Sequence, residues 1–339
     1  EIFVYEKMID KKNLANKNSV LDFIYYLNKI FLKIPFFKKI FVTKSDTNKI
    51  LNFLRSSFKT TEFNEDELIE LLGLFYLEKI FYKWILKYKK IEKVFFHGYS
   101  KSLLSATGEL EIKSYEFQHG DISETTFLYK YKKETLKKYK KSIIIPDNIL
   151  LYSSVWAKNI QLPSKIIEIG SVFHNIKTKK NSIKPNCLAI ISSPLENNLL
   201  INFAKKLASL NSDLKIYYKL HPSQYHLMNK HKIIFKSFKN IEMVRVDISV
   251  NDLSIFVDQF VVYYSTVVYE LLQLKKIIFL IKGRYHLTLK KYLNFSNIIL
   301  INNPEDIIKL NKDKMRIVKR SEISFFKPLI QKNLNKIFK

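Results

Sequence analysis

The sequence predicts an α/β protein with two domains, each built on a parallel β-sheet with crossover helices. Its 339 residues fit two domains of ordinary size. Hydrophobic residues make up 47% of the chain and aromatic residues 14%, which is enough for a sizeable core and excludes a disordered chain. Short apolar runs alternate with segments of helical periodicity, a pattern typical of parallel sheets. We expect a central cleft between the domains, lined by polar groups at strand ends.

The N-terminal half contains a mixture of predicted elements. Residues 62–90 have apolar side chains at helical spacing and open with Glu65, Asp66 and Glu67, which favour a helix start. Residues 129–141 hold seven lysines and one glutamate; they predict a solvated loop or helix face or, alternatively, a polyanion contact. Apolar runs predict strands at 94–96, 114–118, 143–145 and 149–152.

The C-terminal half is more regular. Helical periodicity is found in residues 198–210 and 267–274. Further strands are predicted at 187–192, 214–220, 242–246, 260–264, 277–281 and 298–301. Strands that alternate with helices in this way predict a second parallel sheet.

The polar segment 177–185 has no periodic pattern, so we place a domain boundary there. The expected organisation is an N-terminal domain over 1–176, a C-terminal domain over 186–320 and a basic helix over 321–339. The longest apolar stretch, 21–42, is broken by four lysines and Pro35 and cannot span a bilayer. This stretch and residues 323–339 predict either surface helices whose apolar faces join the core or segments that lie on an anionic membrane.

Charge and composition limit the partners and cofactors. The chain has 58 Lys and Arg against 31 Asp and Glu, a net charge of +27, and so prefers nucleic acid, anionic lipid or phosphorylated small molecules. The six glycines stand apart from one another, which excludes a Gly-rich phosphate loop. The one cysteine, Cys187, excludes an intrachain disulfide framework and a multi-cysteine metal site, and fits a reducing compartment.

Polar residues follow the predicted strand 114–118. His119, Gly120 and Asp121 stand at its carboxyl end, where Gly120 lets the backbone turn. A histidine there can take up a proton near neutral pH, so His119 is a candidate general base. Asp121 or Glu116 is the candidate to orient His119 or to act in its place. The structural alternative is a turn histidine bonded to the backbone.

A second polar group follows the predicted strand 214–220. Pro222 suits the first turn of the next helix. A helix N-terminus carries partial positive charge and binds phosphate. His221 can donate a hydrogen bond to a phosphate oxygen or a leaving group, and Lys219 adds charge. The alternative is a strand-end histidine without a ligand.

A third polar group follows the predicted strand 260–264. The hydroxyls of Ser265 and Thr266 and the free backbone N–H groups of the next helix predict an anion site. Glu270 lies one helical turn beyond Thr266 on the same face, where a carboxylate can accept hydrogen bonds from ribose hydroxyls. The alternative is a capped helix with one solvated glutamate. Together the three groups predict a nucleoside phosphate site in the C-terminal domain, with a base from the N-terminal domain.

These motifs resemble those of bacterial glycosyltransferases of the GT-B architecture, in which two Rossmann-like domains face each other. The nearest likeness is to capsule and lipopolysaccharide enzymes that use a CMP-activated acid sugar: sialyltransferases, polysialyltransferases and Kdo transferases. His221-Pro222 is similar to their HP motif, and Ser265-Thr266 is similar to their Ser/Thr pair. The likeness covers about residues 93–302, through short motifs.

The resemblance implies a role for each matching residue. His221 would contact the CMP phosphate and assist its departure, Ser265 and Thr266 would hold that phosphate, and Glu270 would contact the nucleoside. The N-terminal motif departs from the sialyltransferases, which carry an acidic pair before the glycine and use a carboxylate as base. The residues here, Gln118-His119-Gly120, look like those of the polyol-phosphate polymerases of teichoic-acid type, and this resemblance implies that the histidine is the base.

The expected function is therefore metal-independent, inverting transfer of an acid sugar from a CMP-activated donor to an anionic glycan or lipid-linked glycan acceptor. We expect it to serve capsule or lipooligosaccharide synthesis in the cytoplasm or at the inner membrane surface, with no cofactor besides the donor. A metal is not expected, because no Asp-x-Asp or His/Cys grouping stands at a strand end. The alternatives are a polyol-phosphate transferase, a UDP-sugar glycosyltransferase and, outside enzymes, a basic nucleic-acid-binding protein. The last has no recognition motif here, and the lysines are spread along the whole chain.

Overall fold

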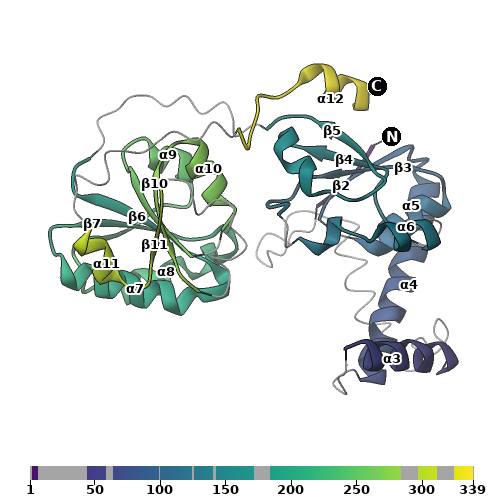
Figure 1. Ribbon diagram of the computed structural model, residues 1–339, viewed down its shortest axis with the longest axis horizontal. Coiled ribbons are helices and arrows are strands. Elements are labelled where there is room, and N and C mark those ends of the chain that lie inside the picture. Colours follow the sequence, from purple (N-terminus) through teal and green to yellow (C-terminus); the bar gives the residue numbers. More distant parts are fainter. Residues whose placement is uncertain are drawn as a thin grey trace. The chain divides into compact units, whose positions relative to one another are not determined.

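The computed structural model describes residues 2–6, 44–58, 64–98, 100–123, 126–139, 143–171, 184–263, 265–283, 297–310 and 324–338. These residues form two β-sheets with helices around each (Figure 1). None of the helices in these ranges is long and apolar enough to cross a membrane.

The first sheet has five strands in the order β1-β2-β3-β4-β5, of which β1 to β4 run parallel. The strands are β1 (Ile2–Glu6), β2 (Lys93–His97), β3 (Lys113–Phe117), β4 (Asn148–Leu151) and β5 (Lys165–Glu168). Its helices are α3 (Lys44–Phe58), α4 (Glu65–Tyr88), α5 (Lys101–Glu109) and α6 (Lys133–Tyr139). The core between α4, α5 and the sheet includes Leu86, Phe96 and Leu103, all fully buried.

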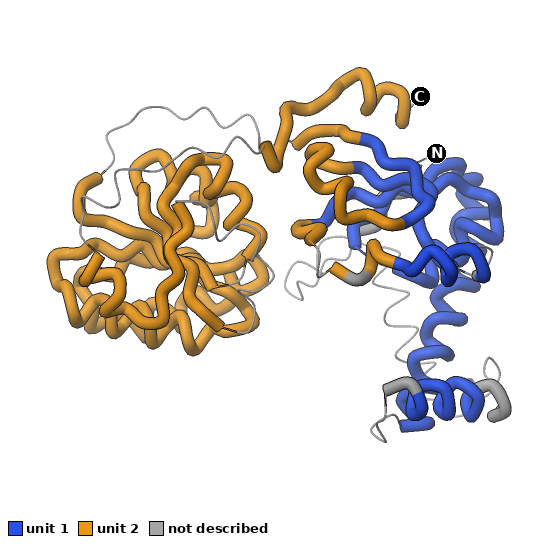
Figure 2. Tube along the Cα trace, in the orientation of Figure 1, with its two compact units in different colours: residues 1–119, 131–150, 162–167 blue, residues 120–130, 151–161, 168–339 orange. Residues whose placement is uncertain are grey.

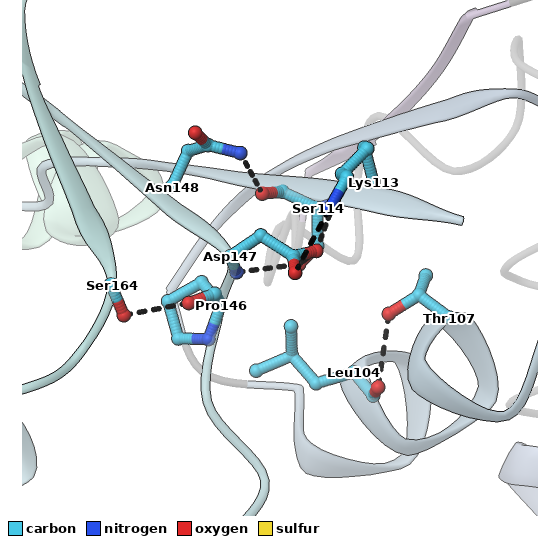
Figure 3. Close-up of polar contacts among 8 residues, drawn as sticks. All are labelled: Leu104, Thr107, Lys113, Ser114, Pro146, Asp147, Asn148 and Ser164. Carbon is cyan, nitrogen blue, oxygen red and sulfur yellow. Dashed lines mark hydrogen bonds and ion pairs between the residues drawn. The ribbon is translucent and has the colours of Figure 1, made fainter. Parts of the chain in front are cut away.

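The start of β4 is fixed against the start of β3 by hydrogen bonds (Figure 3). Asp147 Oδ2 accepts from the backbone N–H and the hydroxyl of Ser114, each at 2.9 Å. The Asn148 side chain donates to the Ser114 carbonyl at 3.2 Å. These contacts lie at the amino ends of the strands, away from the edge where ligands bind in such sheets, so they set the strand register.

The second sheet has six parallel strands in the order β11-β10-β9-β6-β7-β8. The strands are β6 (Cys187–Ile191), β7 (Lys215–Lys219), β8 (Ile241–Met243), β9 (Gln259–Val262), β10 (Ile277–Ile281) and β11 (Ile298–Ile301). Helices α7 (Asn197–Leu210), α8 (Met228–Ile234) and α11 (Pro304–Lys309) cover one face, and α9 (Val250–Ser254) and α10 (Val267–Gln273) cover the other (Figure 1). Counted from β6, this is the 3-2-1-4-5-6 strand order of a Rossmann fold.

Contacts divide the chain into two compact units that are discontinuous in sequence (Figure 2). The first unit comprises residues 1–119, 131–150 and 162–167, and the second comprises 120–130, 151–161 and 168–339. The second unit thus holds the second sheet, the segments that follow β3 and β4, and α12 (Gln331–Phe338). In it, Trp156 packs on Tyr269, and its indole N–H donates to the Phe325 carbonyl at 2.8 Å.

The predicted α/β class is confirmed, and each predicted strand of the C-terminal half is present. The strand predicted at 143–145 is wrong, because these residues are described and form no strand. The Ile144 carbonyl accepts from Lys101 Nζ at 2.6 Å instead of a ladder partner, and the chain joins the sheet only after Pro146. The predicted membrane or surface stretch 21–42 and most of the predicted boundary 177–185 lie outside the described residues.

Candidate functional site

The centre of the second sheet is the place where such a fold binds a ligand. β6 and β9 are neighbours there, and the helices that follow them, α7 and α10, lie on opposite faces (Figure 1). In folds of this strand order, ligands bind outside the carboxyl ends of the two strands at which the order reverses. Ser192 follows β6, and Ser265 and Thr266 follow β9, so hydroxyls stand on both sides of this switch point.

Ser265 and Thr266 begin α10 in different ways. The Ser265 hydroxyl accepts from the backbone N–H of Val267 at 3.3 Å, and its carbonyl accepts from the N–H of Val268 at 3.2 Å. Two of the backbone N–H groups predicted to bind an anion at this helix start are therefore already bonded to Ser265. Thr266 is exposed and makes no side-chain cap, so its hydroxyl is the one presented to solvent.

Glu270 lies one turn along α10 from Thr266 and is partly buried. Burial raises its pKa from the ordinary value of 4.5 to about 7. The pKa of Tyr152 is raised as well, first by burial and second by the charge of Glu270. A carboxyl group that is half-ionised near neutral pH can gain or lose a proton as a ligand binds.

Two residues of the first motif meet α10 within the second unit. The Tyr269 hydroxyl donates to Asp121 Oδ1 at 2.6 Å. Gly120 has a φ of +74°, and a Cβ placed on it would lie 2.8 Å from Thr266 Cγ2. The close approach explains why glycine stands there, and it brings the segment after β3 against the start of α10.

His221 and Pro222 follow β7 as predicted. Pro222 occupies the first turn of a short 3₁₀ helix, Pro222–Leu227, and His221 caps it. His221 Nδ1 accepts from the backbone N–H of Ser223 at 3.2 Å, so that N–H is not left for a phosphate. Burial lowers the pKa of His221, and in the neutral ring with Nδ1 as acceptor the proton must be on Nε2. His221 is therefore a hydrogen-bond donor through Nε2.

Lys219 is buried, with 4% of its surface exposed. Its Nζ donates to the Tyr225 hydroxyl at 3.1 Å and lies 5.0 Å from the centre of that ring. The positive charge predicted for this strand end is thus held inside the fold by Tyr225.

A buried polar network behind His221 was not predicted as part of the site. The Ser192 hydroxyl donates to Gln224 Oε1 at 2.8 Å, and Gln224 Nε2 donates to Asn197 Oδ1 at 3.0 Å. His231, fully buried, reaches the same Asn197 oxygen at 3.1 Å. The network joins the ends of β6 and β7; the two serines after the apolar run 187–191 were its only sequence signal.

His119, the predicted base, is exposed after β3 in the first unit. Its Nδ1 lies 2.7 Å from His97 Nε2, at the end of β2. Partial burial lowers the pKa of His119, which favours the neutral, proton-accepting ring at pH 7. Neither predicted orienting residue makes this contact: Asp121 bonds Tyr269, and Glu116 is fully buried within β3.

No protein-family model and no curated protein matches the sequence. Solved structures are similar in fold. The UDP-GlcNAc 2-epimerase of Methanocaldococcus jannaschii, in complex with UDP-GlcNAc and UDP, is 14% identical with a TM-score of 0.50, over 78% of this chain and 80% of that one. The Neisseria meningitidis UDP-GlcNAc 2-epimerase bound to UDP-GlcNAc is 12% identical with a TM-score of 0.50, over 86% and 88%. A putative UDP-N-acetylglucosamine 2-epimerase from Listeria monocytogenes is 14% identical with a TM-score of 0.51, over 86% and 84%.

At such identities the similarity shows the fold alone. Together with the two parallel sheets it confirms the expected GT-B architecture of two Rossmann-like domains. The narrower resemblance to CMP-sugar transferases stays a prediction.

Proposed function

We propose that the protein is a metal-independent, inverting glycosyltransferase that binds a nucleotide-activated sugar at the switch point of its second sheet. The observation that carries this proposal is the set of groups at the carboxyl ends of β7 and β9, on either side of β6: the His221 donor, the exposed Thr266 hydroxyl and the partly buried Glu270. The departing phosphate gains negative charge as the glycosidic bond breaks. Donors held in place by the fold stabilise that charge without a cation.

The individual roles follow from the hydrogen-bonding capacity of each group. His221 Nε2–H donates to the donor phosphate, and Thr266, with Ser265 behind it, completes the phosphate contact. Glu270 accepts hydrogen bonds from the ribose hydroxyls. Two residues hold the end of β7 in place. The charged Lys219 side chain bonds Tyr225, and Pro222 forms the first turn of the 3₁₀ helix that follows.

His119 is assigned to deprotonate the acceptor hydroxyl, which gives inversion at the anomeric carbon. Its lowered pKa, which favours the neutral ring, and its exposure both suit a base. Asp121 is the alternative base, but its bond to Tyr269 favours a positioning role for this carboxylate.

The sequence motifs favour a CMP-activated acid sugar, of the sialic acid or Kdo type, as donor. A UDP-sugar is the alternative, supported by the UDP-GlcNAc in solved structures of similar fold. A polyol-phosphate transferase is a further alternative, supported by His119-Gly120.

A thermal-shift series with CMP, CDP, UDP and GDP tests the proposal. A ligand that binds only the folded chain raises its Tm by mass action, so the true nucleotide gives the largest shift. We expect Glu270→Ala to lose that shift and Glu134→Ala, on the exposed face of α6, to keep it. Absence of a shift with every nucleotide at millimolar concentration contradicts the proposal.

We also propose that the protein meets its acceptor at an anionic membrane surface. In the first unit, α4 exposes Ile80, Trp84 and Tyr88, which are spaced four residues apart and share one face. Trp84 stacks on Tyr88 with ring centres 5.6 Å apart, and the three lysines within 87–90 are exposed beside them. Aromatic and basic side chains together are typical of helices at membrane interfaces, where each lysine contributes about 1 kcal/mol.

Vesicle sedimentation tests this surface. We expect recovery with vesicles that contain phosphatidylglycerol, little recovery with phosphatidylcholine alone, and a marked loss in the Trp84→Ser, Tyr88→Ser double variant. Equal recovery with both vesicle types contradicts an electrostatic membrane contact.

A further inference from the structure

His97 and His119 form a pair at one edge of the first sheet. β2 and β3 are parallel neighbours, and His97 is in register with Phe117, two residues before His119. Both imidazoles therefore leave the sheet at the same carboxyl edge. His119 Nδ1 and His97 Nε2 are 2.7 Å apart, and the rings meet edge to face with centroids 3.9 Å apart and planes at 71°.

A contact of this length requires one proton between the two nitrogens. If His97 donates, His119 is left with its own proton on Nε2 and cannot accept another from a substrate at either nitrogen. If His119 donates through Nδ1, its Nε2 carries the lone pair. The direction of this single hydrogen bond thus decides whether His119 is a base.

We propose that His97 is a positioning residue that accepts the Nδ1–H of His119 and so holds the Nε2 lone pair toward the acceptor substrate. This inference rests on the proposed role of His119. When the acceptor O–H bond breaks, the proton joins His119 Nε2 and the ring becomes an imidazolium. Its positive charge is stabilised by the same bond to the acceptor nitrogen of His97, in the way a carboxylate orients and stabilises the histidine of a hydrolase triad.

Titratable groups on the elements next to His119 have other contacts. Asp121 accepts from Tyr269, Glu116 is buried in β3, and Lys101 on α5 donates to the Ile144 carbonyl. Within the described residues, His97 is the side chain that hydrogen-bonds the His119 ring. The histidine pair is built from two neighbouring strand ends, which gives it a fixed geometry.

The tautomer of His119 can be read directly in the full chain. Histidine labelled with ¹⁵N distinguishes a protonated from an unprotonated ring nitrogen, and His119→Gln assigns the signal. At a pH where the ring is neutral, we expect wild-type His119 to be protonated on Nδ1. His97→Ala should shift the proton to Nε2, while His97→Gln, whose amide oxygen can accept, should keep it on Nδ1. His226→Gln, at an exposed position of the second unit, is the control.

Kinetics separates this inference from the proposed function. His97→Ala should slow transfer about 10- to 100-fold, less than the 10²–10⁴-fold cost of losing a general base, and His97→Gln should recover most of the rate. An Nε2-protonated His119 in the wild type, or a tautomer unchanged by His97→Ala, overturns the positioning role. If instead the tautomers behave as expected while His119→Gln retains full transfer, the proposed role of His119 as base is wrong. The hydrogen bond in which His97 accepts from His119 is then still supported.

Discussion

Tyr269 and Asp121, 148 residues apart in sequence, share a hydrogen bond of 2.6 Å between the Tyr269 hydroxyl and Asp121 Oδ1. The bond fastens the residue before Glu270 to the segment that follows β3. Tyr269 is also held by ring contacts with Trp156 and Phe325. The position of Glu270 therefore depends on both a polar and an aromatic contact of its neighbour.

Removal of this bond should loosen α10. In Tyr269→Phe the ring contacts stay while the Asp121 carboxylate loses a donor, and we expect the free energy of unfolding to fall by about 1–3 kcal/mol. Nucleotide binding should weaken in parallel. Urea unfolding and nucleotide titration measure the two effects. Asp121→Asn, which keeps an acceptor oxygen, is the matched control and should be milder than Asp121→Ala; equal effects contradict a role for the bond.

The pKa of Glu270, about 7, predicts a pH dependence of nucleotide binding. Ribose hydroxyls donate to the ionised carboxylate, so affinity should increase as pH rises through about 7, and binding near pH 6 should release a proton. Titration calorimetry in buffers that differ in ionisation enthalpy measures the number of protons released on binding. Glu270→Gln should bind without proton release; a wild type that behaves the same way contradicts the ribose contact.

In the absence of a ligand, the raised pKa of Glu270 has the opposite effect: it makes the folded chain less stable as pH rises. Because the folded chain holds this proton more tightly than the unfolded chain, the contribution of Glu270 to stability is complete below about 4.5 and is lost as pH rises through about 7. The free energy of unfolding of the wild type should therefore fall relative to that of Glu270→Gln as pH rises from 5 to 8. A difference independent of pH contradicts the raised pKa.

Gly120→Ala should disturb the start of α10. The new Cβ would lie 2.8 Å from Thr266 Cγ2, and a φ of +74° costs a side-chain-bearing residue about 1–2 kcal/mol. Thr266→Ser removes the clashing methyl group and keeps the hydroxyl, so the double variant should recover part of the loss. A double-mutant cycle on unfolding free energy measures this coupling; strict additivity would show that the two residues do not touch.

His119→Ala and His221→Ala should each remove most transfer while leaving the fold intact. We expect about 10²–10⁴-fold for loss of the base and about 10²–10³-fold for loss of a phosphate donor. The nucleotide-induced Tm shift should stay normal in His119→Ala and shrink in His221→Ala. Near wild-type turnover in either variant shows that the role given to that histidine is wrong.

The sequence predicted the secondary structure of the second sheet well, because its central strands β6, β9 and β10 are largely buried on both faces and appear as nearly continuous apolar runs. Residues 277–281 are an example, with every side chain buried. The same rule failed at 143–145, where the run is only half-buried and Pro146 follows. An apolar run alone does not show whether a ladder partner is present.

The partners of the candidate site residues were not predicted, for a related reason. His119, His221 and Thr266 stand at strand ends and could be found from spacing. The pairing of His97 with His119 depends on the register of β2 and β3, and the Asp121–Tyr269 bond depends on the tertiary fold. Neither register nor tertiary contact is encoded in local periodicity, so the partners of the predicted residues became visible only in the structure.

Amide hydrogen exchange, with and without the nucleotide that gives the largest Tm shift, tests the central claim most directly. We expect protection in residues 220–224 and 265–272 and around Ser192, at the carboxyl ends of β6, β7 and β9. Protection confined to other parts of the chain, with these segments unchanged, would contradict a nucleotide site at the switch point of the second sheet.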